Sequence, residues 1–344
     1  MTNGLALDNL NIYCTLFNSS YLDKALVLID SLSKRAPNFK LYVFGMDKKV
    51  CELLTKMNLD SVIVVDVGVL EDEKLLALKH ERSFAEYCWT WTPLSIYYVL
   101  TNFSEKICTY IDADMMFYQD PAVLVQEMLD NDSEVLLVKH NFPKENKDAA
   151  ECAGTFCVEF NTFLNTKNSL KTLKKWRDQC IEDCSYSRTV KKTHGDQKYL
   201  DDWPNDYPWA HVLENIGGGV APWNNMRYSF SMDDDRILLN DLEGDATGEL
   251  IFYHFQNIRF LPFGLVNIGL VKKNKFARNV LYKDYLYRIN KKREYLKKEF
   301  GLTFSFNRST YRNKLLRFLQ IYVVPFRLRH LSNLMGKKGK LLFK

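Results

Sequence analysis

The sequence predicts an α/β fold: a doubly wound, mostly parallel sheet with helices on both faces, plus a basic helical C-terminal appendage. Strand-like and helix-like segments alternate over the first 140 residues, which is the pattern of a sheet covered by crossover helices. The chain has 344 residues and 47% of them are hydrophobic, so it is long and apolar enough to bury a large core. From about residue 275 the sequence is helical and strongly basic, which indicates the appendage.

Each element of the first 140 residues has its own local signal. Short apolar runs such as Ile12-Tyr13-Cys14 predict buried strands, and Gly45 ends the second of these strands. The spacing of Leu22, Ala25 and Ile29 predicts an amphipathic helix. The predicted strands are 11–16, 40–44, 61–67, 106–111 and 134–138, and the predicted helices are 21–32, 48–57 and 84–100.

After residue 140 the regular alternation ends. We expect a strand over 151–160, a helix over 170–184, a loop-rich stretch over 185–225 and a strand over 249–255. The triple glycine at 217–219 favours a turn, because it fits neither a P-loop nor a dinucleotide fingerprint. In sheets of this kind ligands bind beyond the carboxyl ends of the strands, so the segments that follow the strands are the candidate site.

Charge is distributed unevenly along the chain. Of its 47 basic and 42 acidic residues, 21 and 3 lie after residue 270, which leaves 26 and 39 in the first 270. An acidic body with a basic tail implies that the tail meets an anionic partner, either nucleic acid or an acidic membrane surface. The acidic body would repel a phosphate backbone and no recognition module is apparent, so we expect no nucleic acid partner.

The eight cysteines form no CxxC pair, and most lie in apolar runs. This usage is typical of reduced core thiols in a cytosolic protein. The N-terminus lacks the basic and apolar regions of a signal peptide, and no apolar run reaches the ~20 residues of a membrane span. The sequence therefore predicts a cytoplasmic protein.

One motif carries the chemistry. The apolar strand 106–111 runs directly into Asp112-Ala113-Asp114, and Asp120-Pro121 follows shortly after. Two carboxylates at a strand end suit a hard divalent cation, which would keep open positions for phosphate oxygens. The alternative for this motif is a solvated pair of aspartates that caps the next segment.

The segment Tyr110-Ile111-Asp112-Ala113-Asp114-Met115-Met116 resembles the DxD segment of nucleotide-sugar glycosyltransferases with the GT-A fold. Within that fold it is most similar to the glycogenin-like and bacterial lipopolysaccharide-galactosyltransferase family (family 8-like). The resemblance covers roughly residues 10–260 and implies a GT-A-like sheet. It also implies Mn²⁺ or Mg²⁺ as cofactor and a nucleotide-sugar, UDP-linked by analogy, as donor.

Further segments match the family and imply roles for single residues. His254, in Tyr253-His254-Phe255, would be the third metal ligand beside Asp112 and Asp114, although alone it would read as a core histidine. Asp196 and Gln197 would act at the reacting sugar, with a helix cap as the alternative for Asp196. The remaining implied donor contacts are Thr15, Asn18, Arg82, Asp112, Ala113, Asp114, Gly154 and Arg259. The family's Asn before Gly154 is missing, and Arg259 stands where the family has a lysine on the phosphates.

These expectations add up to a metal-dependent hexosyltransferase that retains the anomeric configuration. Residues 1–270 would be the catalytic domain, with a nucleotide-binding part over 1–140 and an acceptor part over 141–270. The acceptor would be a glycan or glycolipid hydroxyl in lipopolysaccharide, lipooligosaccharide or capsule assembly. The loop tryptophans Trp203, Trp209 and Trp223 would either stack on the acceptor or pack within the protein.

Three alternatives remain at this stage. A haloacid-dehalogenase-type phosphatase also carries a DxD after an apolar strand, although on its first strand. The others are a nucleic-acid-binding protein and a non-catalytic nucleotide-sugar-binding member of the same fold.

Residues 271–344 form the basic helical region. Within residues 308–344 ten basic residues face no acidic one, and Leu315, Phe318, Leu319 and Tyr322 share one helical face. Such a segment is typical of a peripheral attachment to an anionic membrane, here the inner face of the cell membrane. The alternative is a helix docked on the catalytic domain.

Overall fold

The computed structural model describes residues 10–36, 38–186, 194–262, 265–269, 271 and 274–305, together with the backbone of Val323–Pro325. A seven-stranded sheet forms the centre, in the order β3-β2-β1-β4-β7-β6-β8. Only β7 runs antiparallel to its neighbours β4 and β6. The other pairs are parallel, so the predicted mostly parallel α/β fold is confirmed.

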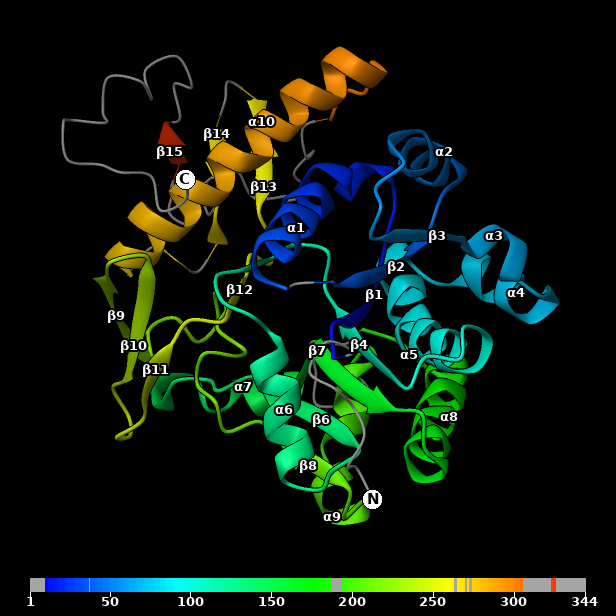
Figure 1. Cartoon of the computed structure of the whole chain (residues 1–344), viewed down its shortest axis with the longest axis horizontal. Coiled ribbons are helices and arrows are strands. Elements are labelled where there is room, and N and C mark those ends of the chain that lie inside the picture. The colour runs from blue at the N-terminus through cyan, green and yellow to red at the C-terminus, as the bar shows by residue number, and fades with distance from the viewer. Residues whose placement is uncertain are drawn as a thin grey trace.

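The strands of this sheet are β1 (Ile12–Phe17), β2 (Lys40–Gly45), β3 (Val62–Asp66), β4 (Ile107–Ile111), β6 (Val135–Lys139), β7 (Phe156–Leu164) and β8 (Ala210–Val212). The helices are α1 (Leu22–Arg35), α2 (Lys48–Met57), α3 (Val67–Leu70), α4 (Glu73–Glu81), α5 (Phe84–Asn102), α6 (Ala122–Asp130), α7 (Ala149–Ala153), α8 (Lys167–Glu182), α9 (Trp203–Asp206) and α10 (Tyr282–Phe300). The helices cover both faces of the sheet, with α5 and α8 away from α1 and α10 (Figure 1).

Smaller strands build a second layer beside the main sheet. β5 (Met115–Phe117) pairs with β12 (Phe252–His254), and β9 (Tyr228–Asp233), β10 (Arg236–Asp241) and β11 (Thr247–Glu249) form a sheet of their own. β14 (Leu265–Asn267) pairs with β13 (Arg259–Leu261) on one side and with the backbone of β15 (Val323–Pro325) on the other. None of these strands except β12 was predicted, because three-residue strands and half-exposed hairpins carry almost no periodic signal.

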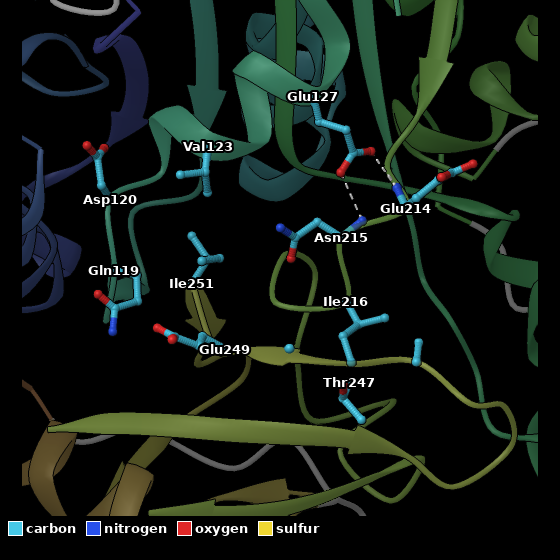
Figure 2. A pocket seen from close by; sticks show the side chains of 12 residues that line it. Gln119, Asp120, Val123, Glu127, Glu214, Asn215, Ile216, Thr247, Glu249 and Ile251 are labelled. Atoms are coloured by element: carbon cyan, nitrogen blue, oxygen red, sulfur yellow. Dashed lines mark hydrogen bonds between the residues drawn. The ribbon is translucent and has the colours of Figure 1, made fainter. Parts of the chain in front are cut away.

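A hollow of about 590 Å³ lies between α6 and this second layer (Figure 2). It is lined by Asp120, Glu127, Glu214 and Glu249, among others. Glu127 accepts hydrogen bonds from the backbone amides of Glu214 and Asn215 at 2.7 and 3.0 Å, and Asp120 accepts from the amide of Ala122 at 3.0 Å. The carboxylates of Glu127 and Asp120 therefore hold the surrounding loops.

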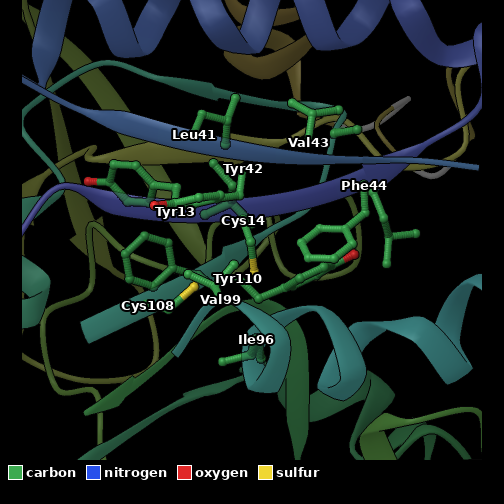
Figure 3. Packing of buried hydrophobic residues seen from close by; sticks show 14 of the residues in the cluster. Tyr13, Cys14, Leu41, Tyr42, Val43, Phe44, Ile96, Val99, Cys108 and Tyr110 are labelled. Atoms are coloured by element: carbon green, nitrogen blue, oxygen red, sulfur yellow. The ribbon is translucent and has the colours of Figure 1, made fainter. Parts of the chain in front are cut away.

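In the core, successive side chains of β1 point to opposite faces of the sheet. Cys14 lies toward α5, with its Sγ 3.6 Å from the Ser95 hydroxyl, and packs near Ile96 and Val99 (Figure 3). Its neighbour Tyr13 faces the other way, toward the ring of Phe117 in β5. This alternation follows from the two-residue period of a strand, and it requires apolar residues on both sides of a central strand.

One predicted boundary is wrong. The segment 151–160 was expected to be a strand throughout, but residues up to Ala153 belong to α7 and the strand runs over Phe156–Leu164. Gly154 separates the two with a φ of 94°, a conformation that favours glycine and ends the helix.

The helical part of the basic appendage packs on the body. Lys292 and Arg293 of α10 form ion pairs with Asp30 and Asp23 of α1, at 2.7 and 2.5 Å. The rest of the predicted membrane segment, residues 308–344, lies outside the described residues except for the β15 backbone. No helix in the described part of the chain is both long and apolar enough to cross a membrane. All eight cysteines are free thiols.

Candidate metal and donor site

The three predicted metal ligands meet at the carboxyl end of β4. Asp112 and Asp114 lie in the turn between β4 and β5, and β5 pairs with β12 so that His254 is opposite Met115. The backbone amide of Phe255 donates to the Asp114 carbonyl at 2.8 Å, which fixes this register. The β5–β12 pair therefore brings together residues that are 140 positions apart in the sequence.

The side-chain geometry suits a divalent cation. His254 Nε2 lies 3.0 Å from Asp114 Oδ1 and 3.6 Å from Asp112 Oδ2. Neighbouring ligands in an octahedral Mg²⁺ site, each at about 2.1 Å from the ion, are about 3.0 Å apart. His254 is buried, whereas the side chain of Asp112 is 34% exposed, so the cluster opens to solvent on the Asp112 side. Two carboxylates and an imidazole are a donor set that Mn²⁺ accepts readily.

Glu159 orients the imidazole, and the sequence analysis missed it. This residue is fully buried in β7, and its Oε2 lies 2.6 Å from His254 Nδ1. A metal-binding histidine is commonly held in this way by a carboxylate on its second nitrogen. The available signal was an acidic residue in the middle of an otherwise uncharged strand, where a charge needs a partner.

The charges of the cluster perturb one another. Burial and the neighbouring carboxylates of Asp114 and Glu159 raise the pKa of Asp112 to about 6, although His254 works against the rise. Burial also acts to raise the pKa of Asp114, but the hydrogen bond and charge of His254 outweigh it and lower that pKa to about 2. Burial lowers the pKa of His254, yet its carboxylate partners raise it well above the usual value. A divalent cation would take the place of the imidazolium proton.

A second set of donor atoms lies on the other side of the imidazole. Cys157, Glu159 and His254 have ligand atoms within 4.8 Å of one another, all buried. Burial raises the pKa of the Cys157 thiol, so the thiol stays protonated. The Glu159 carboxylate is already bound to Nδ1 at 2.6 Å, and a metal here would break that bond. The geometry favours the open Asp112, Asp114 and His254 set.

A pocket of about 470 Å³ adjoins the metal ligands. Asp112 and His254 line one part of it, and Asp196 and Gln197 line another. Its remaining walls are rich in aromatic rings, including Trp89, Phe142, Tyr186, Trp223 and the imidazole of His140. His140 stacks on Phe142 at 4.8 Å between centroids, and Trp223 meets it edge-on at 5.5 Å. Such a pocket, apolar with a few converging polar groups, fits a small polar ligand with flat faces.

Asp196 presents its carboxyl to this pocket. It is the residue before a one-turn 3₁₀ helix (Gln197–Leu200), but its side chain makes no capping hydrogen bond to that helix. Trp176 Nε1 donates to its backbone carbonyl at 2.9 Å, which holds the segment in place. Burial raises the pKa of Asp196 to about 7, and the charge of Asp112 adds to this. Gln197 Nε2 donates to the Ala153 carbonyl at 2.6 Å.

Apart from the metal ligand Asp114, six predicted donor contacts do not line this pocket, and one of them is Ala113, which lies between the two aspartates. Thr15 is buried within β1, Asn18 caps the turn at Ser20 with a bond of 3.1 Å, and Gly154 ends α7. Arg82 donates to the carbonyls of Cys180 and Ile181 at the end of α8, both at 2.7 Å, and Arg259 donates to Asn257 at 3.0 Å. The two arginines are thus engaged in local structure.

The loop tryptophans fall into two groups. Trp223 lines the pocket. Trp203 packs against Trp176 and Phe163, and Trp209 stacks on Tyr207, so these two stabilise the loop region.

The fold and the cluster define an α/β protein of the GT-A-like type, with a candidate metal site at the carboxyl edge of its sheet. Galactosyltransferase LgtC, solved with donor and acceptor sugar analogues, superposes with a TM-score of 0.50 over 81% of this chain and 95% of that chain, at 12% identity. A likeness at this identity shows the fold, and it confirms the GT-A-like architecture.

Two curated proteins of Bacillus subtilis (strain 168) are similar in sequence. YfnF is 32% identical over 268 residues, which span 76% of this chain and 84% of YfnF. YfnD is 31% identical over 245 residues, which span 71% of this chain and 76% of YfnD. No family model matches the chain. The chain belongs to the family of YfnF and YfnD, both of which are described as uncharacterized proteins.

Proposed function

We propose that this protein is a metal-dependent glycosyltransferase that moves a hexosyl residue from a UDP-sugar to a hydroxyl group. The observation that carries the proposal is the convergence of Asp112, Asp114 and His254 at the rim of a GT-A-like sheet, beside a pocket that holds Asp196. The galactosyltransferase LgtC, solved with donor and acceptor sugar analogues, has the same fold. The phosphatase alternative is not favoured, since the similar solved structure is a glycosyltransferase.

In this proposal Asp112, Asp114 and His254 hold Mn²⁺ or Mg²⁺, with Glu159 orienting His254. When bound, the cation would neutralise the negative charge of the donor diphosphate, which is the leaving group. Asp112 forms the exposed side of the cluster and faces the pocket in which the sugar would lie. The donor nucleotide would extend from the metal along the backbone of Ala113 toward the end of β1 at Asn18, while Thr15, which is fully buried, would support this edge from within the sheet.

Asp196 is the residue proposed to act at the sugar. Its carboxyl lines the same pocket as Asp112, and its pKa of about 7 lets it be ionised above neutral pH. As a carboxylate it would stabilise positive charge on the sugar ring during a transfer that retains the anomeric configuration. Gln197, tied to the Ala153 carbonyl, would hold the sugar hydroxyls from the side.

The acceptor is proposed to be a glycan or lipid-linked glycan, bound between the aromatic walls of the pocket. Trp223, Phe142 and Trp89 offer flat apolar faces of the kind that pack on sugar rings. The basic C-terminal region would place the enzyme at an anionic membrane surface, where lipid-linked acceptors for a surface polysaccharide are found.

The experiment that tests this function is a screen of nucleotide-sugars by thermal unfolding, with and without Mn²⁺. A UDP-sugar together with Mn²⁺ should raise the melting temperature more than either component alone, because ligand bound only to the folded state stabilises it. The same mixture should then be tested for release of UDP. If no nucleotide-sugar gives a Mn²⁺-dependent shift and none is turned over, the proposed function is wrong.

A further inference from the structure

Lys24 is a buried cation beside the candidate metal ligands. It lies in the first turn of α1 and is only 5% exposed. Its Nζ is 3.8 Å from Asp114 Oδ2, while the other oxygen of the same carboxylate contacts His254. The ring of Tyr21 covers the ammonium group at 3.6 Å from Nζ to the ring centroid. The sequence analysis did not single out this residue, because its partner comes from a turn 90 positions later.

The ammonium group has few other charges near it. Asp23, the adjacent residue, directs its side chain to Arg293 of α10 at 2.5 Å. Asp114 is therefore the carboxylate that balances Lys24, and His254 shares it. A buried lysine is costly unless it is paired, so the negative charge of Asp114 stabilises Lys24 at this place.

Binding of a divalent cation would change this balance. Asp114 would then be a ligand of the metal, and the ammonium group of Lys24 would lie close to a second positive charge. An anion that reaches both would relieve the repulsion, and a diphosphate has the right charge and length to do so. Lys24 is thus placed to make binding of metal and of a diphosphate depend on each other.

The basic residues that the resemblance implied for this task are used elsewhere. Arg82 donates to two backbone carbonyls at the end of α8, and Arg259 donates to Asn257. Like Lys24, neither of them lines the pocket next to Asp112, so the contacts of the three side chains decide between them. Among the residues that the structure describes, Lys24 is the lysine or arginine whose side chain forms an ion pair with the cluster.

We propose that Lys24 binds the diphosphate of a nucleoside-diphosphate donor, beside the metal held by Asp112 and Asp114. This inference rests on the proposed function and assigns it a residue that replaces the expected Arg259. The ring of Tyr21 lies against the ammonium group, and the attraction of the cation to the ring keeps it in place in the absence of donor.

The test is calorimetric titration of the full-length protein with UDP and, separately, with uridine, both in Mn²⁺. The variants are Lys24→Met, which keeps the chain length without the charge, and Lys24→Arg, which keeps the charge. Arg259→Gln is the matched control. Lys24→Met should weaken UDP binding at least tenfold and leave uridine binding within twofold. Lys24→Arg and Arg259→Gln should keep the preference of the wild-type protein for UDP over uridine.

Two results would overturn the role of Lys24. One is UDP binding by Lys24→Met that equals the wild type in Mn²⁺. The other is an equal loss of UDP and uridine affinity, which would mean that Lys24 only balances Asp114 in the fold. Should Lys24→Met fail to fold, a loss of the UDP preference in Lys24→Arg would decide against the proposal, and its retention would support it. Absence of Mn²⁺-dependent UDP binding in the wild-type protein would instead refute the proposed function itself.

Discussion

At the scale of single residues, the candidate site is a group of acidic side chains that would repel one another without cations. Asp112, Asp114 and Glu159 surround one imidazole, and in the metal-free protein His254 and Lys24 balance them. Several like charges in a buried position lower the stability of the folded protein unless opposite charges, such as that of a bound cation, balance them. The arrangement is therefore best explained by an ion that replaces the imidazolium proton.

Glu159 is expected to matter for metal affinity although it does not face the metal. Glu159→Gln removes the negative charge behind His254 Nδ1 but keeps the size of the side chain. We expect Mn²⁺ to bind roughly tenfold more weakly, the lower end of what loss of such a partner costs. Free Mn²⁺ can be followed by electron paramagnetic resonance. An unchanged dissociation constant would show that Glu159 supports only packing.

Asp196 should make stability depend on pH. Its folded pKa of about 7 lies above the ordinary value of 3.8, so the folded protein holds this proton where the unfolded chain has lost it. The contribution to stability is full below about pH 4 and is lost as the pH rises to about 7. Asp196→Asn should therefore raise the melting temperature of the metal-free protein increasingly between pH 4 and 7, and by a constant amount above. A difference that is the same at all pH values would contradict the raised pKa.

At the scale of elements, the sequence predicted the parts of the fold that have a strong periodic signal. Strands such as Ile107–Ile111 are apolar throughout because both faces of the central sheet are covered, and α1 shows one apolar stripe. The pairing of β5 with β12 could not be predicted, because each is three residues long and the partners are far apart in sequence. The same holds for Glu159 and Lys24, whose meaning depends on residues brought to them by the fold.

His254 shows the opposite case. Its nearness to Asp112 and Asp114 was expected from the resemblance to a family motif, and the β5–β12 register brings the three together. The arginines that the same resemblance named do not join them, because Arg82 and Arg259 bond to groups of their own neighbourhood.

Arg82 is predicted to stabilise the contact between α5 and α8. It follows the last residue of α4 and bonds to the carbonyls of Cys180 and Ile181, which are among the otherwise unpaired groups at the end of α8. Arg82→Gln should lower stability by about 2 kcal/mol, the usual cost of losing charged hydrogen bonds to partly buried acceptors. Urea unfolding measures this, and Lys48→Gln, which removes an exposed pair with Glu52, is the control.

Measurements of UDP binding distinguish this structural role of Arg82 from the donor contact that the resemblance implied. Arg82→Gln should bind UDP and Mn²⁺ as the wild-type protein does. Weaker UDP binding at unchanged stability would instead return Arg82 to the donor site.

At the scale of the whole molecule, the uneven charge distribution suggests attachment to an anionic surface. The chain carries 21 basic and 3 acidic residues after residue 270, and part of that charge is used where α10 pairs with α1. The four lysines Lys337, Lys338, Lys340 and Lys344 belong to the predicted membrane segment. Each basic residue near an anionic surface is worth about 1 kcal/mol at low salt.

Replacement of these four lysines by glutamine should reduce sedimentation with phosphatidylserine vesicles at low salt. High salt should release the wild-type protein, since the attraction is screened. The control replaces the exposed Lys48, Lys49 and Lys56 of α2, which should leave sedimentation unchanged. Equal binding of the tail variant and the wild-type protein would mean that these lysines do not attach the protein to membranes.

The central claim is that Asp112 and Asp114 hold a metal ion that activates a nucleotide-sugar. The most direct test measures the release of UDP from the UDP-sugar that gives the largest thermal shift, with an acceptor sugar present. The wild-type protein should require Mn²⁺ or Mg²⁺ and lose activity reversibly in EDTA. The variant Asp112→Asn/Asp114→Asn has nearly the same side-chain shapes, and we expect it to keep its fold by circular dichroism at 25 °C with a lower melting temperature, because Lys24 and His254 lose a charged partner. Its turnover at that temperature should fall by at least a hundredfold. Full turnover by this variant in EDTA would contradict the account.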